Sequence, residues 1–214
     1  MKLRFAWLSV IAACLTLSAT PVRAQTDLYD NGPVADVQDA WTINFGFSVS
    51  DTMQVNGTVQ GLDFWALLIP GDIPTSVEVQ IGTSPFANNL FDQTVNLTSS
   101  NCFSDPFGFN LCQESSVFSG PTLNGNYWLT LSNASVPDGD PVFWNQNFGA
   151  GCQAPGCPSS AQENSVGTIP SESFTVLGSS SSTSTTGTTP EPASWLLLAS
   201  GVLGAAGILR RKLF

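Results

Sequence analysis

Short runs in which apolar and polar residues alternate, separated by turn signals, are the feature that most constrains the fold of this chain. In residues 41–47, Trp41, Ile43, Phe45 and Phe47 alternate with smaller or polar residues. This is the period of a half-buried β-strand. No helical period of useful length occurs before residue 193. We therefore expect an all-β fold, an antiparallel β-sandwich of jelly-roll-like form.

The other expected strands follow from the same pattern. They cover residues 52–59, 62–69, 77–81, 90–97, one or two stretches within 107–118, and residues 127–131, 142–144 and 173–177. Residues 62–69 are more continuously apolar, which predicts a central strand with Trp65 in the core. A turn near Gln60 and Gly61 separates this strand from the one before it. Residues 25–37 are polar and rich in turn signals.

Charge is distributed very unevenly along the chain. The segment from Gln25 to Leu209 contains all 16 acidic residues but no Lys, Arg or His. The six basic residues lie near the two ends, as Lys2, Arg4, Arg23, Arg210, Arg211 and Lys212. A purely anionic body cannot neutralise phosphates, so nucleic-acid binding is excluded. Without histidine, Ser-His-Asp and Cys-His catalysis and His-based metal sites are excluded too.

The N-terminal residues have the pattern of a secretory signal peptide. Two basic residues precede an apolar region over residues 5–19, and Val22-Arg23-Ala24 has the small-x-small form of a cleavage site. This predicts export through the Sec translocon, with Gln25 as the first mature residue. An alternative is a lipoprotein signal ending at Cys14, but it would cut the apolar region short, so we favour the signal peptide over residues 1–24.

The C-terminal residues have the pattern of a membrane anchor. Pro190, Glu191 and Pro192 precede an uncharged apolar run over residues 193–209, and Arg210, Arg211 and Lys212 follow it. At about 1.5 Å per residue, a helix over this run spans about 25 Å, close to the minimum that crosses a bilayer. The basic tail, residues 210–214, keeps to the cytoplasmic side, so the body lies outside. These residues alone are also compatible with a plain tail anchor.

The order of these three parts resembles the PEP-CTERM sorting signal of Gram-negative bacteria. The resemblance covers residues 190–214 and rests on the Pro-Glu-Pro motif, the transmembrane helix and the basic cluster at the end. It implies that an exosortase, a membrane protease resembling a transpeptidase, processes the chain. By analogy with other C-terminal sorting signals, the tail would be cut and the body released or transferred to a surface component. Such proteins typically occur in bacteria that make extracellular polysaccharide.

Four cysteines remain after removal of the signal peptide. An even number in an exported chain favours disulfides. We expect Cys102 to pair with Cys112 and Cys152 with Cys157, because short loops close most readily. A four-thiolate metal site is the alternative, but these spacings lack the paired C-x2-C pattern that is usual for zinc.

Two further groups of residues are candidates for ligand binding. Trp128 opposes the apolar face of its expected strand, and Trp144 lies beside asparagines, so both are candidates for stacking on a sugar ring; core packing is the commoner fate of an aromatic side chain. Asp138 and Asp140 flank a glycine and offer oxygens to Ca²⁺. The spacing of an EF-hand is absent, so we favour an exposed acidic turn and expect no cofactor.

The sequence therefore predicts four segments and ranks several functions. The segments are the signal peptide (1–24), the β-sandwich (25–177), a flexible Gly/Ser/Thr linker (178–189) and the sorting signal (190–214). The leading hypothesis is a non-enzymatic protein of the cell surface or extracellular matrix, held in the inner membrane as a precursor. The second is a carbohydrate-binding module for extracellular polysaccharide. A glycoside hydrolase needs two paired carboxylates that the sequence cannot identify, and an ice-binding protein needs a rigid threonine-rich face.

Overall fold

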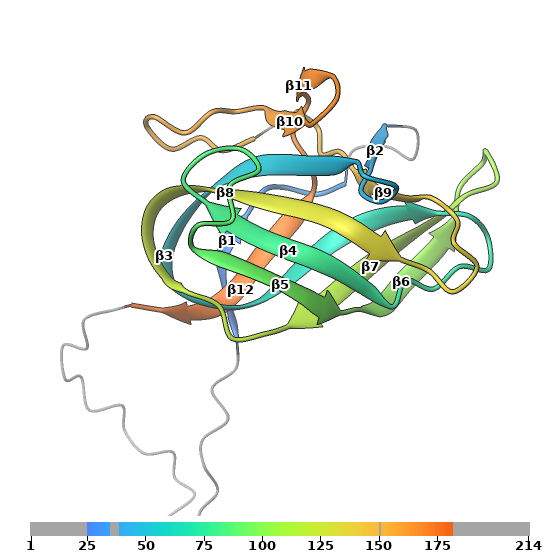
Figure 1. The fold of residues 1–214 in the computed structure, drawn as a ribbon, viewed down its shortest axis with the longest axis horizontal. Coiled ribbons are helices and arrows are strands. Elements are labelled where there is room, and N and C mark those ends of the chain that lie inside the picture. The colour runs from blue at the N-terminus through green and yellow to red at the C-terminus, as the bar shows by residue number, and fades with distance from the viewer. Residues whose placement is uncertain (1–24, 35–38, 150, 182–214) are drawn as a thin grey trace, which may run out of the picture. The chain divides into compact units, whose positions relative to one another are not determined.

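The computed structural model describes residues 25–34, 39–149 and 151–181. This part of the chain contains β-strands and no helix, which confirms the all-β prediction, and its strand pairs are antiparallel (Figure 1). The strands are β1 (Thr26–Asp30), β2 (Ala40–Thr42), β3 (Ser48–Leu68), β4 (Ser76–Gly82), β5 (Phe91–Asn96), β6 (Thr98–Ser104), β7 (Asn110–Val117), β8 (Thr122–Ser135), β9 (Val142–Asn145), β10 (Ala161–Glu163), β11 (Gly167–Ile169) and β12 (Phe174–Ser180).

Strand β3 organises the domain because its two halves belong to different layers. Its first half, from Ser48 to Thr58, pairs with β8, which continues to β4 and β5. Its second half, from Gly61 to Leu68, pairs with β7, which continues to β6. Strand β12 pairs with residues 57–64 of β3 and joins β1 to the second layer. Figure 1 shows β3 curving round the left side of the view between the two groups.

The continuity of β3 corrects the expectation of two strands separated by a turn at Gln60 and Gly61. Glycine at positions 57 and 61 lets neighbouring strands come close where β3 bends. A Cβ atom on Gly57 would lie 2.5 Å from the carbonyl oxygen of Ser179, and one on Gly61 would lie 2.6 Å from that of Ser116. The glycines therefore mark a close approach between strands and not a chain reversal.

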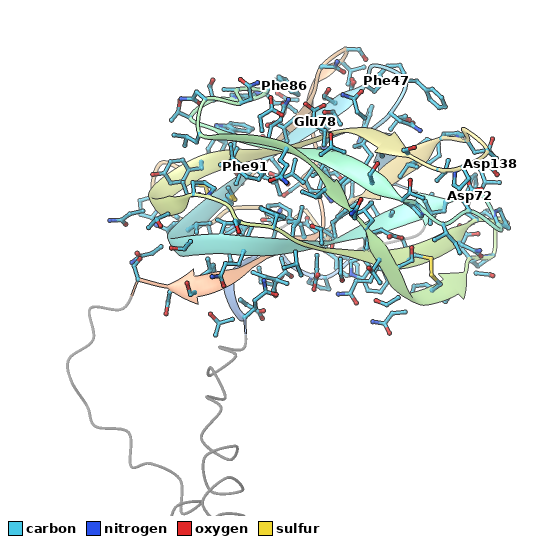
Figure 2. The ribbon with its side chains drawn as sticks, turned by 60° about the horizontal axis from the view of Figure 1, so that its bottom comes forward. Phe47, Asp72, Glu78, Phe86, Phe91 and Asp138 are labelled. Carbon is cyan, nitrogen blue, oxygen red and sulfur yellow. A yellow bond between two sulfur atoms is a disulfide. The ribbon has the colours of Figure 1, made fainter. Side chains whose placement is uncertain are left out.

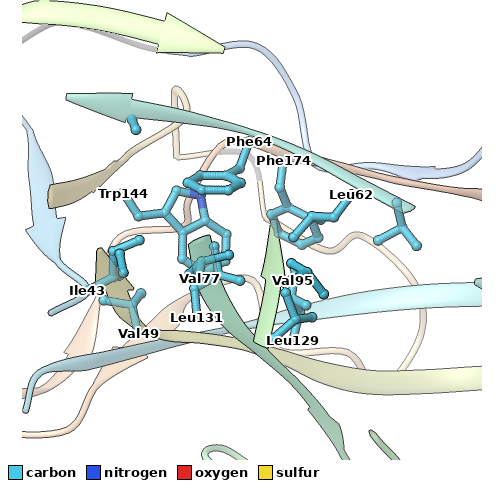
Figure 3. Packing of buried hydrophobic residues seen from close by; sticks show 14 of the residues in the cluster. Ile43, Val49, Leu62, Phe64, Val77, Val95, Leu129, Leu131, Trp144 and Phe174 are labelled. Atoms are coloured by element: carbon cyan, nitrogen blue, oxygen red, sulfur yellow. The ribbon is translucent and has the colours of Figure 1, made fainter. Parts of the chain in front are cut away.

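The hydrophobic core lies between the two layers. Aromatic side chains of the second layer meet aliphatic side chains of the first, and Figure 3 shows Leu62, Phe64, Trp144 and Phe174 across from Val77, Val95, Leu129 and Leu131. The Trp144 ring makes edge-on contacts with Phe64 and Phe174, at centroid distances of 6.2 Å and 5.5 Å. Burying each such side chain contributes roughly 1.5–3 kcal/mol to folding.

The expected strand over residues 41–47 is shorter in the structure. Strand β2 ends at Thr42, and a turn follows in which the Phe47 N–H donates to the Asn44 carbonyl oxygen at 3.0 Å. Phe45 and Gly46 both have positive φ, at 56° and 87°. The alternation of apolar and polar residues continues through residues 43–47, although these residues form a turn and not a strand. Phe45 is therefore exposed instead of buried.

Both ends of the domain contain strand where the sequence indicated a turn-rich segment or a linker. Strand β1 lies within residues 25–37 and pairs with β12. Strand β12 extends to Ser180, three residues into the segment expected to be a linker. Residues 182–189 of the linker, the signal peptide and the sorting signal lie outside the described residues. Within the described part, no helix is long and apolar enough to cross a membrane.

Candidate functional site

A hollow of ≈ 210 Å³ lies on the second layer, among strands β1, β3, β7 and β12. It is smaller than the roughly 300–1,000 Å³ of drug-sized ligand pockets. Its lining residues are Asp30, Gly32, Pro33, Asp63, Phe64, Trp65, Gln113, Ser173, Phe174 and Thr175. The lining combines two carboxylates and other polar groups with one half-buried tryptophan, Trp65.

The strand register gathers the oxygen-bearing side chains at this hollow. Thr175 on β12 lies opposite Asp30 on one side and Asp63 on the other. The Asp30 carboxylate accepts a hydrogen bond from the Gly32 N–H at 2.9 Å, which holds the turn after β1. Two carboxylates and a hydroxyl thus lie along one row across three neighbouring strands.

Aromatic surface lies beside this polar row. Trp65 contacts Phe103 with a centroid distance of 6.0 Å and a tilt of 58°, and Phe103 is 48% exposed. Gln113, opposite Trp65, donates from Nε2 to Asp63 Oδ2 at 3.4 Å and accepts at Oε1 from Asn101 Nδ2 at 2.7 Å. An aromatic pair next to a network of amides and carboxylates can stack on a sugar ring while binding its hydroxyls.

The sequence prediction missed Trp65 as a surface residue. The run around it is apolar on both sides, but β3 alternates, so Phe64 and Ala66 face the core while Asp63 and Trp65 face outward. The charged Asp63 two residues earlier was the available signal, because residues i and i+2 of a strand share a face.

The two tryptophans proposed as sugar-binding residues have different environments. Trp144 is fully buried and donates its indole N–H to the Ser173 carbonyl oxygen at 3.0 Å. It therefore belongs to the core and presents no face to a ligand, which corrects that prediction. Trp128 is half-buried on β8, opposite Thr52 and Gly82.

A second polar site joins two loops at one end of the domain. Asp72 follows β3 in a tight turn, and Asp138 and Asp140 lie in the loop between β8 and β9. One carboxylate oxygen from each of the three lies within 4.8 Å of the others, and Figure 2 shows Asp72 and Asp138 at the same end. The sequence indicated the pair Asp138 and Asp140, but only the fold brings in Asp72.

Asp72 is the buried member of this acidic loop cluster, which we define as Asp72, Asp138 and Asp140. Its side chain is 8% exposed, and its Oδ2 atom has no hydrogen-bond partner among the described residues. Burial and the neighbouring carboxylates of Asp138 and Asp140 raise the pKa of Asp72 to about 6. Asp138 is exposed, so the cluster is accessible to solvent.

A third acidic group is buried inside the sandwich. Asp51 lies on the inward face of β3 and accepts hydrogen bonds from Asn31, Ser171 and the N–H groups of Thr52 and Glu172, at 2.7–3.0 Å. Burial raises the pKa of Asp51 to about 6, although these hydrogen bonds lower it. Burial, together with the Asp51 charge, also raises the pKa of Glu172 well above its usual range.

The buried acids are enclosed and have no route to a substrate. Asp51 and Glu172 are fully buried, and neither Glu172 oxygen has a hydrogen-bond partner in the described part of the chain. Glu114 is buried nearer the edge of the second layer and accepts from Ser99 Oγ at 2.8 and 2.9 Å. Burial raises the pKa of Glu114 to about 7. These side chains determine stability and its pH dependence.

The disulfides join the cysteines in the two expected pairs. Cys102–Cys112 links the adjacent strands β6 and β7, and Cys152–Cys157 closes a short loop. Among the described residues all four cysteines are therefore paired, which leaves no thiol for a metal site or a nucleophile.

Comparison with known families adds evidence for the end of the chain that lies outside the described residues. Residues 188–212 match the model of the PEP-CTERM protein-sorting motif. This match includes Pro190, Glu191, Pro192, Arg210, Arg211 and Lys212, the residues that the sequence analysis singled out. No curated protein matches the chain. The chain therefore carries a PEP-CTERM protein-sorting motif and is an exported protein targeted to exosortase.

Proposed function

We propose that the chain is the precursor of a non-enzymatic protein of the cell surface or extracellular matrix. The match of residues 188–212 to the PEP-CTERM motif is the observation that carries this proposal. The Sec translocon exports the chain, a helix over residues 193–209 holds it in the inner membrane, and exosortase then separates the domain from this helix. The two disulfides of the domain suit an oxidising destination.

Processing is tested by following the chain in its host with and without exosortase. With the enzyme, we expect an intact mass that lacks residues 193–214, recovered outside the inner membrane. Without it, the longer form stays in the membrane. Replacing Pro190, Glu191 and Pro192 by alanine should have the same effect, whereas Thr185→Ala, a change before the matched residues 188–212, should not. Equal masses and locations in all strains would refute the proposal.

The side chains available support a binding role in preference to catalysis. The body from Gln25 to Leu209 has no basic side chain, and the described cysteines are all in disulfides. Asp30 and Asp63 are the carboxylates at the hollow, and both accept hydrogen bonds from the protein itself. A measured turnover of glycoside substrates by the purified chain, abolished in Asp63→Asn, would refute the non-enzymatic assignment.

A second, compatible function is the binding of neutral polysaccharide at the hollow. The observation that favours it is the Trp65–Phe103 aromatic pair beside the row formed by Asp30, Thr175 and Asp63. This combination offers stacking to the apolar face of a sugar and acceptors to its hydroxyls. The absence of basic residues from the body makes anionic sugars poor ligands.

A glycan array with matched tryptophan variants tests this second function. We expect Trp65→Ala to abolish the signal and Trp128→Ala, a change of the same size on β8, to preserve it. Circular dichroism establishes that both variants are folded, and Gln113→Ala provides a milder change at the same hollow. Loss of signal only in Trp128→Ala would move the site to β8, and a blank array with folded protein would refute sugar binding.

A further inference from the structure

The acidic loop cluster concentrates negative charge that the protein itself does not balance. Asp72, Asp138 and Asp140 place three carboxylate oxygens within 4.8 Å of one another. No Lys, Arg or His occurs between Gln25 and Leu209, so this body has no side chain that can form an ion pair with them. Three ionised carboxylates at this separation repel one another. The arrangement therefore needs either bound protons or a bound cation.

The burial of Asp72 is a separate observation that points to a ligand. Asp72 is 8% exposed and its Oδ2 atom is buried without a hydrogen-bond partner among the described residues. An unsatisfied buried carboxylate oxygen costs free energy unless something binds it. The adjacent Asp138 is exposed and Asp140 is half-buried, so the oxygens of the cluster lie between the protein interior and solvent.

The loops that carry the cluster are held by backbone contacts that do not involve the carboxylates. The Asp72 N–H donates to the Ile69 carbonyl oxygen at 3.1 Å, and the Gly139 N–H donates to that of Val136 at 3.2 Å. The Asn44 side-chain amide donates to the Asp140 carbonyl oxygen at 2.9 Å. The loop backbones are therefore held in place without using the Asp72 Oδ2 atom, which has no hydrogen-bond partner among the described residues.

We propose that Asp72, Asp138 and Asp140 bind one Ca²⁺ ion, which joins the β3–β4 loop to the β8–β9 loop. A set of oxygen ligands suits hard cations, and Ca²⁺ accepts irregular coordination completed by water. Mg²⁺ requires near-ideal octahedral geometry and loses its water reluctantly, so it binds here more weakly. Extracellular Ca²⁺ modules have dissociation constants on the order of 10⁻⁴ to 10⁻³ M, and we expect the same range.

The test is calcium titration of the full chain purified in detergent, by calorimetry and by thermal unfolding. At constant ionic strength, we expect binding of one Ca²⁺ per chain, a higher Tm with Ca²⁺ than with chelator, and a smaller rise with Mg²⁺. Asp138→Asn should weaken Ca²⁺ binding at least tenfold, because it removes one exposed ligand without changing the core. Asp72→Asn should do the same.

The control variant is Asp27→Asn, which removes one exposed carboxylate from β1, a strand that carries none of the three ligands. It should leave the Ca²⁺ titration unchanged. Absence of Ca²⁺ binding by the wild-type chain at 10 mM would overturn the proposal, as would equal binding in Asp138→Asn and wild type. An equal loss in Asp27→Asn would mean that Ca²⁺ responds only to the overall charge, which also overturns it.

Discussion

Asp51 and Asp72 are both buried carboxylates in a domain without a basic side chain, but their surroundings differ. Asp51 lies inside the sandwich and accepts four hydrogen bonds from the protein. Asp72 lies at a loop end, where its Oδ2 atom has no partner among the described residues and two further carboxylates are close. The interior group is stabilised by fixed donors, whereas the loop group is open to an external cation.

This difference shows how a protein without basic residues keeps buried acids. Where solvent cannot reach, backbone N–H groups, amides and hydroxyls replace the missing counter-ion, and burial raises the pKa of a carboxyl that lacks donors, such as Glu172. Where solvent can reach, as at Asp138, a metal ion from the medium can take the place of a lysine or arginine.

The strongest test of the interior group is Asp51→Ala. It removes from the core the acceptor of the Ser171 hydroxyl and of the Thr52 and Glu172 N–H groups, so we expect the free energy of unfolding to fall by about 3–5 kcal/mol. Urea unfolding at pH 7 measures the change. Asp63→Ala, on the outward face of the same strand, should cost about 1 kcal/mol or less. Similar losses in both variants would mean that the interior hydrogen bonds of Asp51 contribute no more to stability than the surface contacts of Asp63.

The next test is the pH dependence of stability, which follows from carboxyl groups with raised pKa values. The folded chain keeps protons that the unfolded chain releases between the ordinary pKa and the raised one, so stability falls as pH rises from about 3.8 to 7. Asp51 alone, with its pKa raised from 3.8 to about 6, accounts for about 3 kcal/mol. Glu172→Gln should flatten the dependence measured by thermal unfolding between pH 5 and pH 8. An unchanged slope would show that Glu172 is not protonated in the fold.

The smallest expected effect is the change in stability caused by Asp138→Asn in the acidic loop cluster. This change should have one sign in chelator and the opposite sign in Ca²⁺. In chelator, Asp138→Asn relieves repulsion and should stabilise the fold by up to about 1 kcal/mol. With saturating Ca²⁺, the same variant should be less stable than wild type because it loses a ligand. Chemical unfolding in both media measures the reversal, and added NaCl should reduce the chelator effect. A stability change of the same sign in chelator and in Ca²⁺ would contradict the binding of Ca²⁺ by the acidic loop cluster.

The sequence predicted those parts of the fold that depend on local alternation. Strand β4 lies where the apolar residues Val77, Val79 and Ile81 recur at every second position. The continuity of β3 was not predictable, because its pairing with β7, β8 and β12 determines where it bends. Glycine, the residue type that permits the bend, is also common in turns. For this reason the sequence around Gly61 indicated a loop.

The candidate sites were predictable only where their residues are adjacent in sequence. Asp138 and Asp140 were identified from their spacing. Asp72 lies 66 residues before Asp138 in the sequence, and only the fold brings its carboxylate close to theirs. Asp51 similarly meets Ser171 at a separation of 120 residues. Trp144 was misplaced because neighbouring asparagines suggested exposure, although Asn145 is buried as well.

The passage of β3 through both layers has a consequence for how the domain opens. Pulling the layers apart would require breaking hydrogen bonds along a strand that belongs to each of them. The layers therefore cannot detach one at a time, and amide hydrogens on either side of the bend should exchange with deuterium at matching rates, through one cooperative opening. A domain of this kind resists stepwise digestion outside the cell, because partial opening exposes neither half alone.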